Sequence, residues 1–122
     1  HIARPSVFTG NSVKDLGAIA IELADIYKAL DVVGLTLAQL NRGVDARAIK
    51  RPVLSDLRES GQIEEAAYIV LFVHREAYYD DTAPAGAAEI IIAKNRDGAT
   101  GTVSVYWQAD RAHFVNAQQV QL

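Results

Sequence analysis

Apolar residues follow a helical pattern in the first third of the chain. Between residues 13 and 30 they recur three or four positions apart, which places them on one face of an α-helix. Asn11 or Ser12 can cap the start of this helix, and Asp15 completes a capping box with Ser12. We expect Asp31 to end the helix. The pattern predicts a helix that lies on a sheet with its apolar face inward.

Two continuous apolar runs, Val32–Leu37 and Tyr68–Val73, predict strands that are covered on both faces, as in a parallel sheet. Asp97-Gly98 is a strong hairpin signal. The segments around it predict an antiparallel meander of three more strands, at 89–93, 102–107 and 113–115. The expected fold class is therefore α/β, with parallel strands and a flanking helix followed by a C-terminal antiparallel meander.

The composition limits the class of protein. The chain has 122 residues, half of them apolar, and a net charge of −3, which suits one domain or part of one. It has no cysteine, so disulfide scaffolds and cysteine metal sites are excluded. No apolar run approaches the roughly 18 residues that cross a bilayer, and we expect a cytoplasmic protein with no membrane partner. The negative balance means that any DNA contact must come from a local patch.

The ends of the chain and its isolated polar residues carry weaker signals. The chain begins with His1 and contains no methionine, so we expect processing, excision from a longer protein or a tag remnant. Residues 1–11 show no periodicity, and we expect a flexible arm. His74 has no second ligand at metal spacing, so we assign it no metal role. The basic cluster of Arg47, Lys50 and Arg51 is typical of a solvated face.

The polar segment 55–67 lies between the two apolar runs, and function tends to sit in such segments. Within it, the Arg58 guanidinium can fork onto a phosphate, and Gly61 lets backbone N–H groups approach the same anion. This combination favours an anion-binding site. An ordinary helix start is the alternative, because Asp56 and Glu59 are spaced like a capping pair.

Three blocks of sequence resemble replicative DNA helicases of the DnaB type. They occur in the family's order and at similar spacing, at Leu37–Arg42, Lys50–Gly61 and Ala88–Gly98. The resemblance extends from about Ser12 to Asn116 and covers the second half of that family's ATPase domain. It implies a partial RecA-like fold and is far more specific than a lone short motif.

The resemblance also implies roles for six residues. Arg58, Glu59 and Gly61 match the family's DNA-contacting loop, and Gln39 matches the residue thought to sense the terminal phosphate and relay its state towards DNA. Lys94 and Arg96 match a pair that reaches a neighbouring subunit's ATP site, where the arginine acts as a finger. Since they lie two apart in a predicted strand, both should project from one face. A strand-end amide and a basic strand face are the respective alternatives.

Some parts of the ATPase pattern do not occur in this sequence. It has no Gly-x-x-x-x-Gly-Lys-Ser/Thr loop and no apolar strand ending in an aspartate for Mg²⁺, so we expect ATP and Mg²⁺ to act only in the complete protein. In the family, the strand before that loop lies between the two apolar runs. Without it, both edges would be open.

Two functions follow as expectations. The first is part of an ATP-dependent replicative helicase that unwinds duplex DNA as a hexameric ring on single-stranded DNA. The second is a non-enzymatic truncated homologue that binds and regulates such a ring. The Arg-Glu-Ser-Gly block disfavours a recombination ATPase. The Glu65–Tyr68 segment departs from the family's acidic pattern, which puts ordinary helicase behaviour in doubt.

Overall fold

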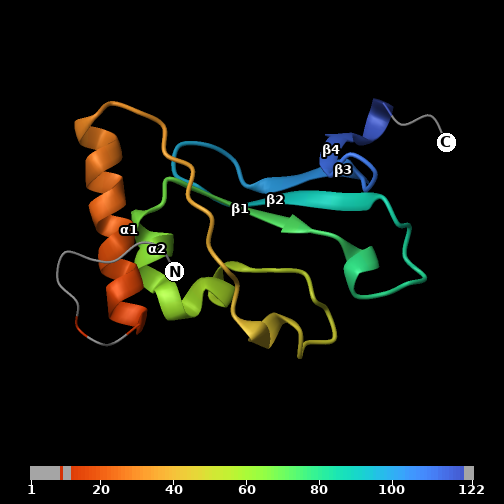
Figure 1. Cartoon of the computed structure of the whole chain (residues 1–122), viewed down its shortest axis with the longest axis horizontal. Coiled ribbons are helices and arrows are strands. Elements are labelled where there is room, and N and C mark those ends of the chain that lie inside the picture. The colour runs from red at the N-terminus through yellow and green to blue at the C-terminus, as the bar shows by residue number, and fades with distance from the viewer. Residues whose placement is uncertain (1–8, 10–11, 120–122) are drawn as a thin grey trace. The chain divides into compact units, whose positions relative to one another are not determined.

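The computed structural model describes Thr9 and residues 12–119, so the expected arm at residues 1–11 lies almost entirely outside the described residues. The chain forms two compact units, one of residues 1–41 and 54–68 and the other of residues 42–53 and 69–122. Figure 1 shows the elements. The helices are α1 (Ser12–Ala29), α2 (Gly61–Ala66) and the 3₁₀ segments η1 (Arg42–Val44), η2 (Leu54–Ser60), η3 (Glu76–Tyr78) and η4 (Ala117–Gln119). The strands are β1 (Ile69–His74), β2 (Ala87–Asn95), β3 (Gly101–Gln108) and β4 (His113–Asn116).

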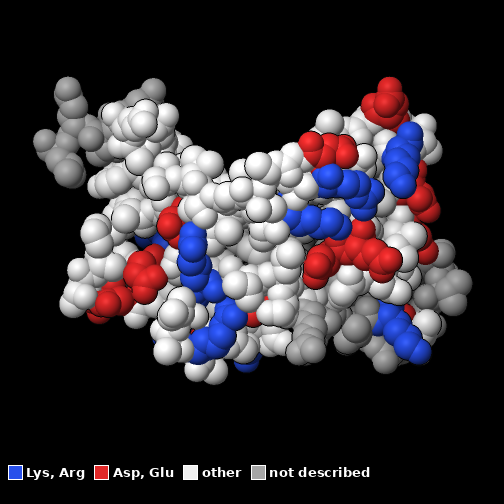
Figure 2. Space-filling view, turned by 180° about the vertical axis from the view of Figure 1, so that it is seen from behind, with Lys and Arg blue, Asp and Glu red and all other residues white. Residues whose placement is uncertain are grey.

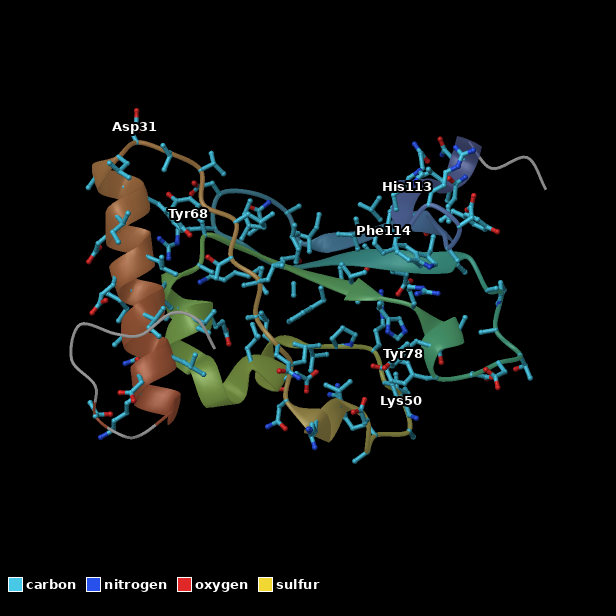
Figure 3. The ribbon with its side chains drawn as sticks, viewed as in Figure 1. Asp31, Lys50, Tyr68, Tyr78, His113 and Phe114 are labelled. Atoms are coloured by element: carbon cyan, nitrogen blue, oxygen red, sulfur yellow. The ribbon has the colours of Figure 1, made fainter. Side chains whose placement is uncertain are left out.

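The first unit is built on α1, as its apolar spacing predicts. Asp31 has a φ of 52°, the left-handed conformation that commonly ends helices, and Figure 3 shows it at the turn out of α1. A Cβ at Gly17 would collide with the Gln62 side chain, so α1 needs glycine where it packs closely against α2. The predicted helix and its end are confirmed.

The second unit is a four-stranded sheet in the order β1-β2-β3-β4, with each neighbouring pair antiparallel. The predicted strand at Tyr68–Val73 and the three-strand meander are confirmed, and Asp97-Gly98 lies in the turn between β2 and β3. One face of β1 is buried, where Val70 and Phe72 are 8% and 5% exposed. Val44 and Pro52 of the 42–53 segment are buried in the same unit. This segment therefore contributes to the core that supports the sheet.

The predicted strand at Val32–Leu37 is wrong. Residues 32–40 form no strand, and Val33, Leu35 and Leu37 are 100%, 84% and 92% exposed. A strand needs a hydrogen-bonded neighbour, and within the described chain nothing pairs with this segment. The expected parallel pairing is therefore also absent among these residues. A backbone hydrogen bond from Val32 N to Tyr27 O (3.0 Å) holds the start of the segment on α1.

The segment 55–67 is helical, not an open loop. The 3₁₀ turns of η2 run directly into α2, which begins at Gly61. Leu57 is 6% exposed and anchors η2 in the first unit. The alternative of a helix start is therefore right about the conformation, and it leaves the chemistry of the segment open.

Candidate functional site

The predicted DNA-contacting residues lie at the junction of η2 and α2. Gly61 is exposed, and a Cβ built on it would meet no atom within 4 Å. Packing therefore does not require glycine at this position. The backbone of Arg58 and Glu59 belongs to η2, while their side chains lie outside what the structure describes.

Gln39 lies in the same unit as this junction. Its side chain is exposed, in the irregular segment that follows α1. Two residues later, Asn41 N donates a hydrogen bond of 3.1 Å to Asp56 O, in η2. The structure thus ties the segment of the predicted sensor to the start of the predicted DNA-contacting segment.

The pairing of β1 with β2 contains an irregularity beside Lys94. Leu71 stands opposite Ile92, whereas the adjacent Val70 stands opposite Lys94. The β2 strand therefore has one extra residue, Ala93, between these two pairs. Such a bulge changes the face from which the following side chains project.

The bulge places Lys94 on the buried face of the sheet. Directly opposed residues of an antiparallel pair share a face, so Lys94 projects with Val70 and, by alternation along β1, with His74. Because His74 stands opposite Glu89, Lys94 also shares a face with Glu89. Arg96 lies just beyond the end of β2, so the expectation that both basic residues belong to the strand is wrong for Arg96.

Arg51 connects the 42–53 segment to two strands of the sheet. Its Nε donates a hydrogen bond to Glu89 Oε2 (2.9 Å), and its Nη2 donates one to Thr102 Oγ1 (2.8 Å). The expectation of a solvated basic cluster is therefore wrong for Arg51. No pattern in the sequence indicates this contact, because Arg51 and Glu89 are far apart along the chain.

A second basic contact joins β1 to β3. The Arg75 guanidinium lies over the Trp107 ring, 4.9 Å from its centre, and Trp107 packs against Phe114 at 4.8 Å between ring centres. The Arg75 Nε is buried without a hydrogen-bond partner. Stacked guanidinium and indole groups are the kind of surface on which a nucleobase stacks. Sequence reasoning missed this pair.

Aromatic residues gather where β1 leads into η3. His74 is 7% exposed, stacks on Tyr79 and lies 2.8 Å from Glu76 Oε2. Lys50 lies over the Tyr79 ring and Tyr78 meets that ring edge-on, so Lys50 and Tyr78 lie close together in Figure 3. Burial, followed by the nearby Asp45 carboxylate, raises the pKa of Tyr79.

The charges in the following turn are locally satisfied. Asp80 Oδ1 accepts hydrogen bonds from Thr82 Oγ1 (2.6 Å) and Thr82 N (2.8 Å), which lower the pKa of Asp80. On the face that Figure 2 shows, basic and acidic side chains lie beside one another. Among the described residues, no group of three or more His, Cys, Asp or Glu side chains could hold a metal ion. No helix in the described part of the chain is long and apolar enough to cross a membrane.

The predicted site residues therefore fall into two groups. Gln39 and the junction around Gly61 belong to the first compact unit, and Lys94 and Arg96 belong to the second. Each group has its own internal links, namely the Asn41–Asp56 hydrogen bond and the Arg51–Glu89 ion pair.

Comparisons with known proteins match nearly the whole chain. The profile of the family described as "DnaB-like helicase C terminal domain" matches residues 3–116. The replicative DNA helicase DnaC of Bacillus subtilis is 44% identical over 110 residues, which are 89% of this chain and 24% of that protein. The replicative DNA helicase DnaB of Haemophilus influenzae is 40% identical over 117 residues, which are 95% of this chain and 25% of that protein. The chain thus spans about a quarter of the length of these relatives.

Solved structures match the backbone equally well. A DnaB-like replicative helicase, solved with a study of its interactions with primase, superimposes with a TM-score of 0.87 at 42% identity, over 92% of this chain and 28% of its own. A second solved structure, of an isolated ATPase domain, gives the same score and identity over 92% of this chain and 40% of that one. The partial RecA-like fold implied by the sequence is confirmed by these helicase ATPase domains.

Proposed function

This chain belongs to the DnaB-like helicase C-terminal domain family, and from that premise we propose that it works as part of an ATP-dependent replicative DNA helicase. In this proposal residues 1–122 form the C-terminal portion of a RecA-like ATPase domain. The assembled protein is a hexameric ring that translocates on single-stranded DNA and unwinds the duplex ahead. The observation that carries the proposal is the ordered match over residues 3–116, which includes every predicted site residue.

Arg58, Glu59 and Gly61 are the DNA-contacting residues in this proposal. A guanidinium neutralises a phosphate and releases counterions from the strand. A glycine lets the backbone approach the strand closely. The open space around the Gly61 Cβ position supports this role, because nothing in the fold itself accounts for glycine there.

Gln39 is the proposed sensor of the nucleotide's terminal phosphate. An amide can donate to a phosphate oxygen and lose that bond after hydrolysis. The Asn41 N to Asp56 O hydrogen bond supports a relay, because a displacement of the Gln39 segment acts on the backbone at the start of η2. The relay therefore needs no contact between Gln39 and DNA.

Lys94 and Arg96 act on the ATP of the neighbouring subunit in this proposal. Charge spreads over the phosphoryl oxygens in the transition state, and a positioned guanidinium contributes about 10³ to 10⁵ in rate. The bulge at Ala93 sets the direction of Lys94, and the end of β2 sets the position of Arg96. The phosphate-binding loop and the Mg²⁺ ligands belong to other parts of the assembled protein.

We assign the Arg75–Trp107 stack to the base of the nucleotide. The guanidinium has one face against the indole ring and can offer the other to a flat heteroaromatic base. The buried Arg75 Nε without a hydrogen-bond partner supports a ligand at this place, since buried polar groups normally have partners.

The DNA role is tested by the salt dependence of single-strand binding. In the complete helicase, Arg58→Ala should weaken binding and lower the slope of log K against log salt by about 0.7, the value for one phosphate contact on a single strand. Arg111→Ala is the matched control, because Arg111 is an exposed arginine, 71% accessible, in the β3–β4 turn. An unchanged slope for Arg58→Ala in a folded ring would refute the assignment.

A further inference from the structure

We propose that Arg51 is a positioning residue that couples DNA binding to ATP hydrolysis. Through its ion pair with Glu89, Arg51 fixes the chain that leads into the DNA-contacting segment onto the strand that carries Lys94. The inference rests on the proposed function, and it adds a residue for which the sequence resemblance implies no role.

The side chain of Arg51 is held from two directions. Its Nε reaches Glu89 on β2 and its Nη2 reaches Thr102 on β3. Thr102 stands opposite Ile91 in the ladder, so the two acceptors lie diagonally on the same face of adjacent strands. Hydrogen bonds of a charged fork to two fixed acceptors define the direction of a guanidinium. Arg51 is therefore fixed on the sheet although its side chain is 42% exposed.

The backbone of Arg51 is held as well. Arg47 Nη2 donates a hydrogen bond of 3.2 Å to Arg51 O, and the next residue, Pro52, is buried. Only Pro52 and Val53 separate Arg51 from the start of η2 at Leu54. Arg51 is thus the last side chain held by the sheet before the chain passes into the segment that contains Arg58.

The other partner of the ion pair acts on the ATP side. Glu89 and Lys94 lie on the same strand and, because of the bulge at Ala93, project from the same face. Arg96 follows at the end of that strand. A pull on Arg51 is therefore applied to the strand that sets Lys94 and Arg96. Two sites coupled in this way should influence each other through the Arg51–Glu89 pair.

The test compares the complete helicase with variants of this pair. The readout is the ratio of kcat for ATP hydrolysis with saturating single-stranded DNA to kcat without DNA. We expect Arg51→Gln and Glu89→Gln each to lower this ratio about tenfold, while single-strand affinity stays within about twofold. The exchanged pair, Arg51→Glu with Glu89→Arg, should restore most of the ratio. Arg111→Gln removes the partner of Asp110 in an exposed pair at 3.4 Å and should leave the ratio unchanged.

A purely structural role predicts a different result. It would lower kcat with and without DNA together, and the ratio would not change. An unchanged ratio in folded, assembled Arg51→Gln rings would overturn the inference. If both single variants fail to fold, Thr102→Val decides, because it removes only one of the two acceptors. We expect it to lower the ratio about threefold, and an unchanged ratio would overturn the inference.

The outcomes also separate this inference from the proposed function. If Arg58→Ala leaves the salt slope of DNA binding unchanged, the proposed function fails first. If Arg58→Ala and Arg96→Ala behave as proposed and Arg51→Gln keeps full DNA stimulation, only the coupling role of Arg51 is wrong.

Discussion

Lys94 stands opposite Val70 in the β1–β2 ladder, one residue out of step with the neighbouring pair of Leu71 and Ile92. Val70 is 8% exposed, so this register directs Lys94 to the buried face of the sheet. Strict alternation from Glu89 would direct Lys94 to the opposite face. One extra residue, Ala93, therefore decides which face of the sheet presents Lys94.

Removal of this extra residue should disable the proposed trans ATP site. Deletion of Ala93 would regularise the ladder and turn the basic residues to the other face. We expect the kcat for ATP hydrolysis in the complete helicase to fall by about 10³, while single-strand affinity is kept. Ala93→Val keeps the residue count and should retain most of the activity. A fully active deletion variant would show that the facing of Lys94 is irrelevant.

Gly61 offers a clean separation of folding from DNA contact. A Cβ at Gly61 meets no atom within 4 Å, so Gly61→Ala should leave the thermal midpoint unchanged or slightly raised. If the DNA strand approaches the backbone here, the added methyl group should weaken single-strand binding about tenfold. Gly101→Ala is the matched control, since the space around the Gly101 Cβ position is equally open. Equal single-strand affinities for the two variants would argue against a close approach at Gly61.

The Arg75–Trp107 stack should determine nucleotide affinity more than turnover. Removal of the indole by Trp107→Ala leaves the Arg75 guanidinium without its stacking partner. We expect the KM for ATP in the complete helicase to rise about tenfold, since stacking of a base is worth about 1–3 kcal/mol. Trp107→Phe keeps an aromatic face and should lie between the two. A normal KM for Trp107→Ala would remove the stack from the nucleotide site.

The sequence was a good guide to elements with a strong local signal. The helix from Ser12 to Ala29 has a clear apolar stripe and a polar end at Asp31. The meander has β-branched strands separated by turn residues such as Asp97-Gly98. In each case the residues that define the element lie close together in the chain, so local chemistry is enough.

The failures share a dependence on distant neighbours. Val32–Leu37 has the composition of a buried strand, yet a strand forms only beside a partner, and Val33 is fully exposed. The bulge at Ala93 is a property of the β1–β2 ladder and has no signature of its own in the sequence. The Arg51–Glu89 and Arg75–Trp107 contacts likewise join residues that only the fold brings together.

The central claim is that Arg96 completes an ATP site on a neighbouring subunit, and mixed rings test it most directly. One set of subunits carries Arg96→Ala, and the other has an intact Arg96 but is unable to bind ATP. Each set alone should hydrolyse ATP about 10³ to 10⁵ times more slowly than the native ring. Mixed in equal amounts, about a quarter of the shared sites combine an intact nucleotide site with an intact finger, so the account predicts that ATPase activity reappears. Mixed rings as inactive as their parents, with assembly verified, would contradict a role in trans.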